Sequence, residues 1–128
     1  MNDLFTALAG GELALPGGRK SADSLPWNDH PAFAGVALKH LVTSADSGGR
    51  YSLHLVRLGP GASIGTHVHE QSWELHQVAG GSGTLDLDGA EVAYHPGVVA
   101  SLPQNAPHAV HAGEDGLRLL AVFAPPLL

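Results

Sequence analysis

From residue 33 onward, short apolar runs alternate with clusters of glycine, proline and polar residues. Runs of this length, without a helical repeat between them, predict β-strands joined by tight turns. We expect nine strands, over residues 33–42, 51–58, 64–69, 73–79, 83–87, 91–95, 98–102, 108–112 and 117–124. Turns are expected between them, including at Gly80–Gly81 and at Gly113–Gly116. This spacing of strands predicts an all-β sandwich or barrel.

The first residues have a different pattern. Residues 2–9 predict a short helix, in which Leu4, Phe5 and Leu8 share one face. Asn2 or Asp3 is the expected cap at its start, because a short polar side chain there accepts a hydrogen bond from the first turn. The paired glycines at positions 10 and 11 are expected to end it.

Residues 10–31 contain glycines and prolines at intervals that argue against a continuous element. We therefore expect an irregular arm that lies on the rest of the molecule, with apolar anchors at Leu13, Leu15 and Trp27; the alternative is a loose tail. The expected organisation is a helix and arm over residues 1–32, packed on a β-barrel over residues 33–128.

Composition narrows the function. The 128 residues are 44 % apolar and 14 % charged, which suits one folded domain rather than a disordered chain. The formal charge of −6, without a Lys/Arg cluster, argues against binding to nucleic acid or to an anionic membrane. The absence of cysteine excludes disulfides and zinc–thiolate sites. No signal-like or membrane-spanning apolar run occurs, so we expect a cytoplasmic protein.

Three histidines and a glutamate lie within ten positions, at His67, His69, Glu74 and His76. On a strand, His67 and His69 would point to the same side, about 7 Å apart. A turn at residues 70–72 would return the chain so that Glu74 lies opposite them. Two imidazoles and a carboxylate that converge on one point are typical of a transition-metal site.

Two spaced motifs extend this pattern. The first is Gly61, five residues, His67-Val-His69, four residues, Glu74, six residues and Gly81. The second is Gly97, five residues, Pro103-Gln-Asn105, two residues and His108. In both motifs the sequence resembles the cupin family of small jelly-roll barrels, and the resemblance covers residues 33–124.

The second motif departs from the family pattern at two positions. Asn105 stands where the family has glycine, and Ala112 stands where it has asparagine. Asparagine is the residue other than glycine that best tolerates positive φ, so we expect the turn to be kept. Ala112 is not at a ligand position, so its change leaves the expected metal ligands intact.

The resemblance implies a single-domain jelly roll, or double-stranded β-helix barrel, with a metal held by His67, His69, Glu74 and His108. Nitrogen and oxygen donors suit one divalent ion of Fe, Mn, Ni, Co, Cu or Zn. An octahedral ion with these four ligands keeps two positions for water, dioxygen or a substrate oxygen. The alternative is a barrel that has the same pattern but binds no metal.

His76 is expected to face the same interior as Glu74, because the two are separated by one residue. It could act as a base beside the metal, as a hydrogen-bond donor to substrate or as another ligand, or it could be a structural histidine. Either Tyr51 or His54, which face opposite sides of one strand, could line the cavity. Arg57 is expected in solvent, with a substrate carboxylate as the alternative partner; Phe123 is expected in the core.

The cupin resemblance does not define one reaction, because the family includes dioxygenases, isomerases, lyases, decarboxylases and binding proteins. We favour a small mononuclear metal-dependent enzyme with dioxygenase-like oxidation of a small oxygen-bearing organic substrate. The alternatives are a Lewis-acid isomerase or lyase with the same site, and a non-catalytic sensor or small-ligand-binding module. We also expect a homodimer, because small cupins pair through sheet edges and the arm can cover such an edge.

Overall fold

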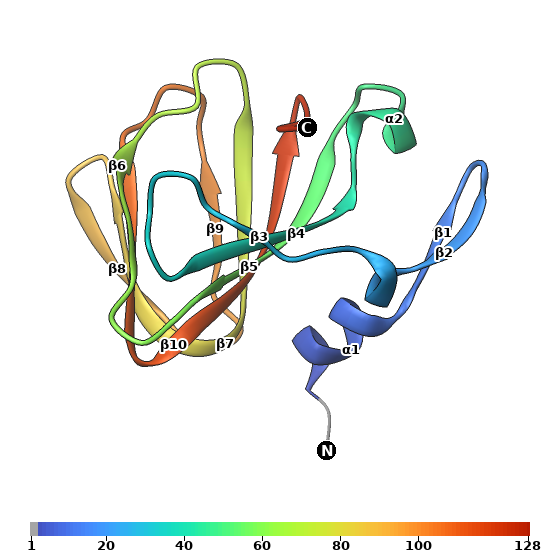
Figure 1. Ribbon diagram of the computed structural model, residues 1–128. Helices are drawn as coiled ribbons and strands as arrows, with labels where there is room; N and C mark the ends of the chain where they lie inside the picture. The colour runs from blue at the N-terminus through green and yellow to red at the C-terminus, as the bar shows by residue number, and fades with distance from the viewer. Residues whose placement is uncertain (1–2) are drawn as a thin grey trace.

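The computed structural model describes residues 3–128 (Figure 1). Met1 and Asn2 lie outside the described residues, and so does the predicted capping role of Asn2. The elements in chain order are α1 (Leu4–Gly10), β1 (Glu12–Leu15), β2 (Gly18–Ser21), a 3₁₀ turn η1 (Ala22–Ser24), β3 (Asn28–Asp29), β4 (Val36–Val42), α2 (Ser44–Ser47), β5 (Ser52–Leu58), β6 (Ser63–His67), β7 (Trp73–Leu87), β8 (Ala90–Tyr94), β9 (Val99–Leu102) and β10 (His108–Ala124).

The fold is an all-β jelly roll, as expected, built around two long strands, β7 and β10 (Figure 1). These two strands pair with each other along most of their length, and every pairing in the barrel is antiparallel. The second half of β10 pairs also with β5, and its first half pairs with β6. In the same way β7 pairs with β9 near its start and with β8 near its end. Each long strand therefore contributes to both layers of the barrel.

The predicted turns at Gly80–Gly81 and Gly113–Gly116 are wrong, because both segments lie inside the long strands. The nine predicted strands accordingly correspond to seven, β4 to β10. Gly81 and Gly116 have φ of +75° and +72°, and a Cβ on Gly81 would lie 2.1 Å from the carbonyl oxygen of Gly116. The ladder between the two strands also shifts register beside them. The glycines thus allow two paired strands to bend together at close approach.

The interior of the barrel is apolar because the strands alternate inward and outward residues. Its fully buried side chains include Leu85, Tyr94, Leu102, Leu117 and Leu119. A second cluster lies between residues 3–27 and the outer face of the sheet, formed by Phe5, Ala22, Leu41 and Leu55 with Leu13 and Trp27 packed against them. Two of the three predicted anchors are therefore in place.

The prediction of an irregular arm is wrong for residues 12–21. Strands β1 and β2 form a hairpin in which Leu15 pairs with Gly18, and Pro16 and Gly17 form its turn. The predicted helix is confirmed over Leu4–Gly10, and Asp3 is its cap: a carboxylate oxygen of Asp3 accepts a hydrogen bond from the Thr6 amide at 2.8 Å. Pro16 and Gly17 therefore mark one tight turn between two strands, and not an irregular segment.

A buried lysine joins the arm to the sheet. Lys39, on β4, is 3 % exposed, and its Nζ donates hydrogen bonds to the carbonyl oxygens of Ala9 at 2.7 Å and Ala22 at 2.9 Å. The ammonium also lies 5.6 Å from the ring centroid of Trp27. A buried charge is tolerated only where such partners replace water.

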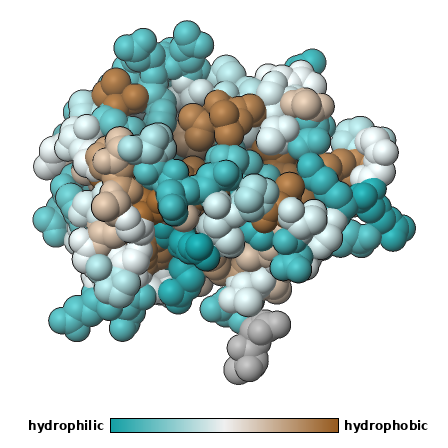
Figure 2. Space-filling view, in the orientation of Figure 1, coloured by the Kyte–Doolittle hydropathy of each residue, from teal (hydrophilic) through white to brown (hydrophobic). Residues whose placement is uncertain are grey.

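The surface has no single large apolar area on the side that Figure 2 shows, where apolar side chains lie in separate groups between hydrophilic ones. Large side chains that remain exposed include Trp73 and Val99. Over residues 3–128 no helix is long and apolar enough to cross a membrane.

Candidate metal centre

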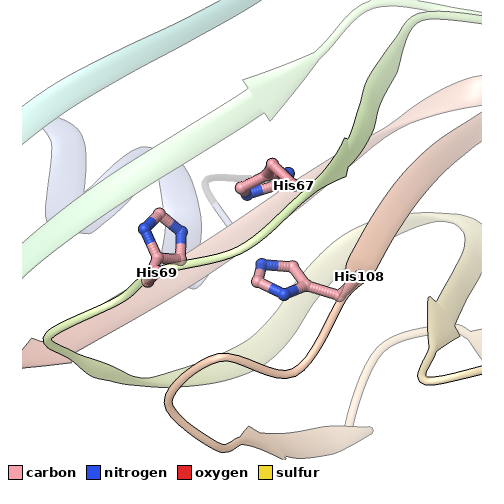
Figure 3. A group of neighbouring side chains, drawn as sticks. All are labelled: His67, His69 and His108. Atoms are coloured by element: carbon pink, nitrogen blue, oxygen red, sulfur yellow. The ribbon is translucent and has the colours of Figure 1, made fainter.

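Three histidines from two segments of the chain converge on one point (Figure 3). His67 is the last residue of β6, His69 follows it by two positions, and His108 is the first residue of β10. Because β6 pairs with β10 so that His67 lies opposite His108, their rings come within 4.2 Å, centroid to centroid. One nitrogen from each ring lies within 4.8 Å of the others, and this group could hold a metal ion.

Glu74 lies beside this group. Its Oε1 is 3.4 Å from Nε2 of His69 and 3.3 Å from Nε2 of His108. The carboxylate comes from the start of β7, after the bend over residues 70–72 that the sequence predicts. The structure therefore brings the four predicted ligands into one cluster.

The loop that contains Asn105 holds the neighbouring loop in place. The Asn105 amide donates a hydrogen bond to the carbonyl oxygen of His69 at 2.9 Å, and the Gln104 side chain donates one to that of Glu70 at 2.7 Å. Asn105 has φ of +67°, so it keeps the turn as expected at the position where the motif has glycine. The second motif thereby helps to position His69 as well as His108.

Backbone carbonyls set the orientation of two of the rings. Nδ1 of His67 lies 2.7 Å from the carbonyl oxygen of Gly65, and Nδ1 of His108 lies 2.9 Å from that of Ala106. A carbonyl can only accept, so each Nδ1 carries the proton and each Nε2 keeps its lone pair when the ring is neutral. This is the arrangement that metal-binding histidines commonly have.

A buried chain of hydrogen bonds holds the other carboxylate oxygen of Glu74. Oε2 lies 2.7 Å from Nε2 of His76, and Nδ1 of His76 lies 2.8 Å from the hydroxyl oxygen of Tyr94. Burial raises the pKa of Tyr94, so its hydroxyl stays protonated and donates to His76. His76 in turn donates to Glu74. The structure thus places His76 inside, as expected, with both of its ring nitrogens engaged.

Glu74 remains ionised in spite of its burial. Desolvation alone would raise its pKa, but His76, His108 and His69 together hold the pKa well below the usual range. For His108, burial lowers the pKa, yet the adjacent Glu74 carboxylate and the Ala106 carbonyl raise it overall. Burial lowers the pKa of His67. The cluster therefore has one permanent negative charge, on Glu74, surrounded by histidine nitrogens that could bind a metal.

Two atoms at this site have no hydrogen-bond partner. In the described part of the chain, three buried side-chain polar atoms lack one: Glu74 Oε1, His108 Nε2 and Arg118 Nε. The first two face each other at 3.3 Å. Buried groups of this kind are normally satisfied, and leaving them without a partner is costly. A cation between them would satisfy both, so the donor set fits a divalent transition metal.

A cavity of about 130 Å³ opens beside the cluster. Its polar lining consists of His30, His67, His69, Glu74 and His76, and its apolar lining of Leu38, Val56, Ile64, Leu119, Phe123 and Leu127. It is smaller than the roughly 300–1,000 Å³ of pockets that bind drug-sized ligands. More open hollows of about 320 and 420 Å³ lie around the β1–β2 hairpin, but they include none of the predicted ligands.

The remaining candidates divide between inside and outside. Phe123 is buried, as expected, and separates His69 from His54, with ring centroids at 4.9 and 5.6 Å. His54 is fully buried, but it does not line the cavity; Tyr51 is 47 % exposed, just before β5. Arg57 is outside, as expected, and lies 4.1 Å from the ring centroid of Trp27.

Sequence reasoning missed His30 and Leu127 as cavity residues. Both lie outside the two motifs, at the end of β3 and in the C-terminal segment after β10. Their approach depends on how the ends of the chain fold back on the barrel, and no local pattern signals it.

The chain also matches known proteins. The family model described as Cupin domain matches residues 54–123. The chain is 28 % identical over 117 residues to dimethylsulfoniopropionate lyase DddW of Ruegeria pomeroyi, covering 89 % of this chain and 76 % of the lyase. It is 34 % identical over 84 residues to L-ectoine synthase of Bordetella parapertussis, covering 60 % of each.

Among solved structures, a predicted oxalate decarboxylase from Thermotoga maritima has the same fold. It matches with a TM-score of 0.71 and 20 % identity, over 98 % of this chain and 99 % of the other. At this identity the likeness concerns the fold alone.

Proposed function

The chain belongs to the cupin family, and from this premise we propose that it is a small metal-dependent enzyme. One divalent transition-metal ion would be held by His67, His69, Glu74 and His108. The observation that carries the proposal is the pair of buried atoms without partners, Glu74 Oε1 and His108 Nε2, which face each other beside a small cavity. The donor set suits Fe, Mn, Ni, Co, Cu or Zn.

The reaction that we propose is a lyase-type elimination on a small oxygen-bearing molecule. Support comes from the relative that aligns with 89 % of the chain, which is a lyase acting on a propionate derivative. In such a step a base from solvent, water or hydroxide, takes a proton from one carbon, and a leaving group departs from the next carbon with its bonding electrons. A double bond forms, and no oxidant is consumed. The bound metal would supply Lewis-acid polarisation of a substrate oxygen.

The side chains around the metal would position its ligands, supply a negative charge and keep bulk water away from the substrate. Glu74 brings the negative charge, and His76 with Tyr94 fixes the direction of its carboxylate. Apolar side chains such as Leu38 and Phe123 make the rest of the cavity wall and limit the size of the substrate. His76 acts here as a positioning residue, because service as a base would require one of its two hydrogen bonds to open.

Dioxygenase-like oxidation of a small organic substrate is the second candidate. The same nitrogen and oxygen donors suit the redox metals Fe, Mn, Ni and Cu, and an octahedral ion would keep two positions for dioxygen and substrate. A sensor that binds a small ligand without turnover needs only the cavity and the metal. The hydrogen bonds from Tyr94 to His76 and from His76 to Glu74 orient a proposed metal ligand, which both an enzyme and a sensor would require.

Metal analysis tests the central proposal. We would purify the protein without chelator or nickel resin, supply the six metals in turn, and measure bound metal by mass spectrometry. One equivalent is expected in the wild type and in His95→Ala, which replaces an exposed histidine away from the cluster. The ion should be lost in His108→Ala. A wild-type protein that binds none of the six would overturn the proposal.

Turnover of the metal-loaded protein would then separate the two candidate reactions. The first substrates to offer are small carboxylates with an acidic C–H on one carbon and a leaving group on the next carbon. Each is assayed in the presence and in the absence of dioxygen. Product formation under anaerobic conditions is expected for the lyase. Turnover that requires dioxygen and consumes it would favour the second candidate instead.

A further inference from the structure

One polar side chain of the cavity comes from a part of the chain that holds none of the proposed ligands. His30 follows β3 directly, and it lines the same cavity as His67 and Glu74. Its backbone amide donates a hydrogen bond to the carbonyl oxygen of Val36 at 2.8 Å, which closes the loop between β3 and β4. Pro31 follows it and restricts the backbone of His30 to extended conformations. The residue is therefore held in place by its own segment.

The ring of His30 is oriented from two sides. Its Nδ1 accepts a hydrogen bond from the Ala32 amide at 3.0 Å. Its ring packs against Phe33, with centroids 4.8 Å apart, and Phe33 in turn lies 6.4 Å from the ring of His67. Because Nδ1 accepts, the neutral ring carries its proton on Nε2. His30 thus presents a hydrogen-bond donor that no protein group uses in the described part of the chain.

The other polar groups of the cavity are already engaged. His67, His69 and Glu74 belong to the proposed metal centre, and both ring nitrogens of His76 are hydrogen-bonded. Among residues 3–128, the remaining lining is aliphatic or aromatic, without lysine or arginine. Of the described side chains that line the cavity, His30 alone offers a polar group that neither the metal centre nor its support requires. A buried substrate with a second polar end would need such a partner.

We propose that His30 binds the end of the substrate that lies away from the metal, by donating its Nε2–H to an oxygen there. The substrate class is then a small molecule with two oxygen-bearing groups, one for the metal and one for His30, joined by a short apolar part that fits the walls. This inference rests on the proposed metal site, and it adds a specificity-determining residue that both motifs leave out.

A matched pair of probe ligands tests this assignment. Fumarate and crotonate share a rigid trans geometry, but a methyl group in crotonate replaces one carboxylate of fumarate. The trans arrangement also prevents fumarate from chelating one metal ion through both ends. Binding is measured by the change in visible absorption of the cobalt(II)-loaded protein, without any need for turnover.

The wild type is expected to bind fumarate about 5- to 10-fold more tightly than crotonate, which is the usual effect of one added hydrogen bond. His30→Leu should remove that preference and leave crotonate affinity unchanged. His30→Gln keeps a donor and should recover part of the preference, and His95→Leu is the control for loss of a histidine elsewhere. Equal preference in the wild type and in His30→Leu would overturn the proposal.

Cobalt content separates failure of this inference from failure of the metal site. If the wild type does not bind cobalt, the proposed function itself is wrong. If cobalt binds at one equivalent in the wild type and in both His30 variants, the site stands, and only the preference between the two probes decides the role of His30. Cobalt bound in the wild type, with a spectrum that neither probe changes, would also count against His30 as a substrate-binding residue.

Discussion

Nε2 of His76 lies 2.7 Å from Oε2 of Glu74, and this contact determines where the other oxygen of the carboxylate points. With Oε2 held, Oε1 lies 3.4 Å from Nε2 of His69 and 3.3 Å from that of His108. His76 and Glu74 are two positions apart on β7, so the alternation of the strand brings both side chains to the same face. One short stretch of strand therefore supplies a charged group and the donor that orients it.

Loss of the His76 ring is expected to weaken metal binding even though His76 is not a proposed ligand. In His76→Leu the carboxylate can rotate, and we expect metal affinity to fall about 10- to 100-fold, as for other groups that orient a ligand. Competition against a chromogenic chelator measures this. Tyr94→Phe, which acts one bond further away, should have a smaller effect in the same direction.

The same variants test the predicted role of His76 as a base. A residue that acts only as a base would change turnover but not metal affinity. Metal affinity within twofold of the wild type in His76→Leu would therefore contradict the positioning role.

Metal affinity should fall as the pH is lowered, and Glu74 should determine where the fall begins. A neutral Nε2 on His108 is needed for metal binding, and the Glu74 carboxylate outweighs burial and raises the pKa of His108 above its ordinary value of 6.5. Protons therefore begin to compete with the metal for Nε2 of His108 at a pH above 6.5, and they compete more strongly as the pH falls. In Glu74→Gln the affinity should be lower at every pH, but the acid-induced fall should begin at a lower pH. Titrations with one metal between pH 5 and 8 compare the two proteins, and coincident midpoints would contradict the coupling.

The ligand positions were predictable because they depend on local spacing. His67 and His69 alternate on one strand, and the gaps to Glu74 and His108 are filled by turns whose residues are visible in the sequence. Even the positive φ of Asn105 follows from the chemistry of that residue.

Other features depend on contacts between distant parts of the chain. The sequence Gly80–Gly81 is compatible both with a turn and with a bend in two paired strands. Only the close approach of Gly116, which the sequence does not record, shows that it is a bend. His30 and Leu127 reach the cavity through the path of the chain ends, which no periodicity records. The His40–His54 contact likewise follows from the register between β4 and β5.

The buried His54 should make folding sensitive to acid. Its ring is fully buried, with Nε2 at 2.7 Å from the Ser52 hydroxyl and Nδ1 at 2.7 Å from Nδ1 of His40. Burial lowers the pKa of His54 from 6.5 to about 4. Between these values the unfolded chain takes up a proton that the folded state excludes, so stability falls as the pH drops from 6.5 towards 4. Above pH 6.5 the His54 ring is neutral in both the folded and the unfolded state, so its effect on stability no longer changes with pH.

The full effect of His54 corresponds to at most about 3 kcal/mol of unfolding free energy. Urea denaturation of the metal-free protein at pH 7, 6, 5 and 4 measures it. His54→Gln should lose less stability across this range than the wild type. Parallel losses in the two proteins would assign the acid sensitivity to other groups.

Lys39 should hold the N-terminal arm on the sheet. Lys39→Met keeps an unbranched side chain but removes the ammonium that bonds to the carbonyls of Ala9 and Ala22. We expect a loss of about 1–3 kcal/mol, because two carbonyl oxygens lose a charged donor. Hydrogen exchange should increase first in residues 4–27. Lys20→Met, at an exposed position in β2, is the control and should change neither quantity.

An exposed apolar face on β7 and β9 is where we expect two copies of the chain to associate. Trp73 is 51 % exposed and Val99 is 60 % exposed. Both point outward, because Glu74 and His76 point inward and Val99 pairs with Gln77. In the described residues β9 pairs with β7 alone, so its other edge is open to a partner strand.

Such a dimer would need to bury roughly 1,200 Å² or more, and tryptophan is among the side chains that contribute most to interfaces of this kind. Light scattering after size exclusion should therefore give a dimer for the wild type at micromolar concentration. Trp73→Arg should shift it to a monomer, since a charge would replace the largest apolar side chain of the face, while Tyr51→Arg, at another exposed aromatic, should remain dimeric. A wild type that elutes as a monomer, or a Trp73→Arg variant that stays dimeric, would exclude this face as the interface.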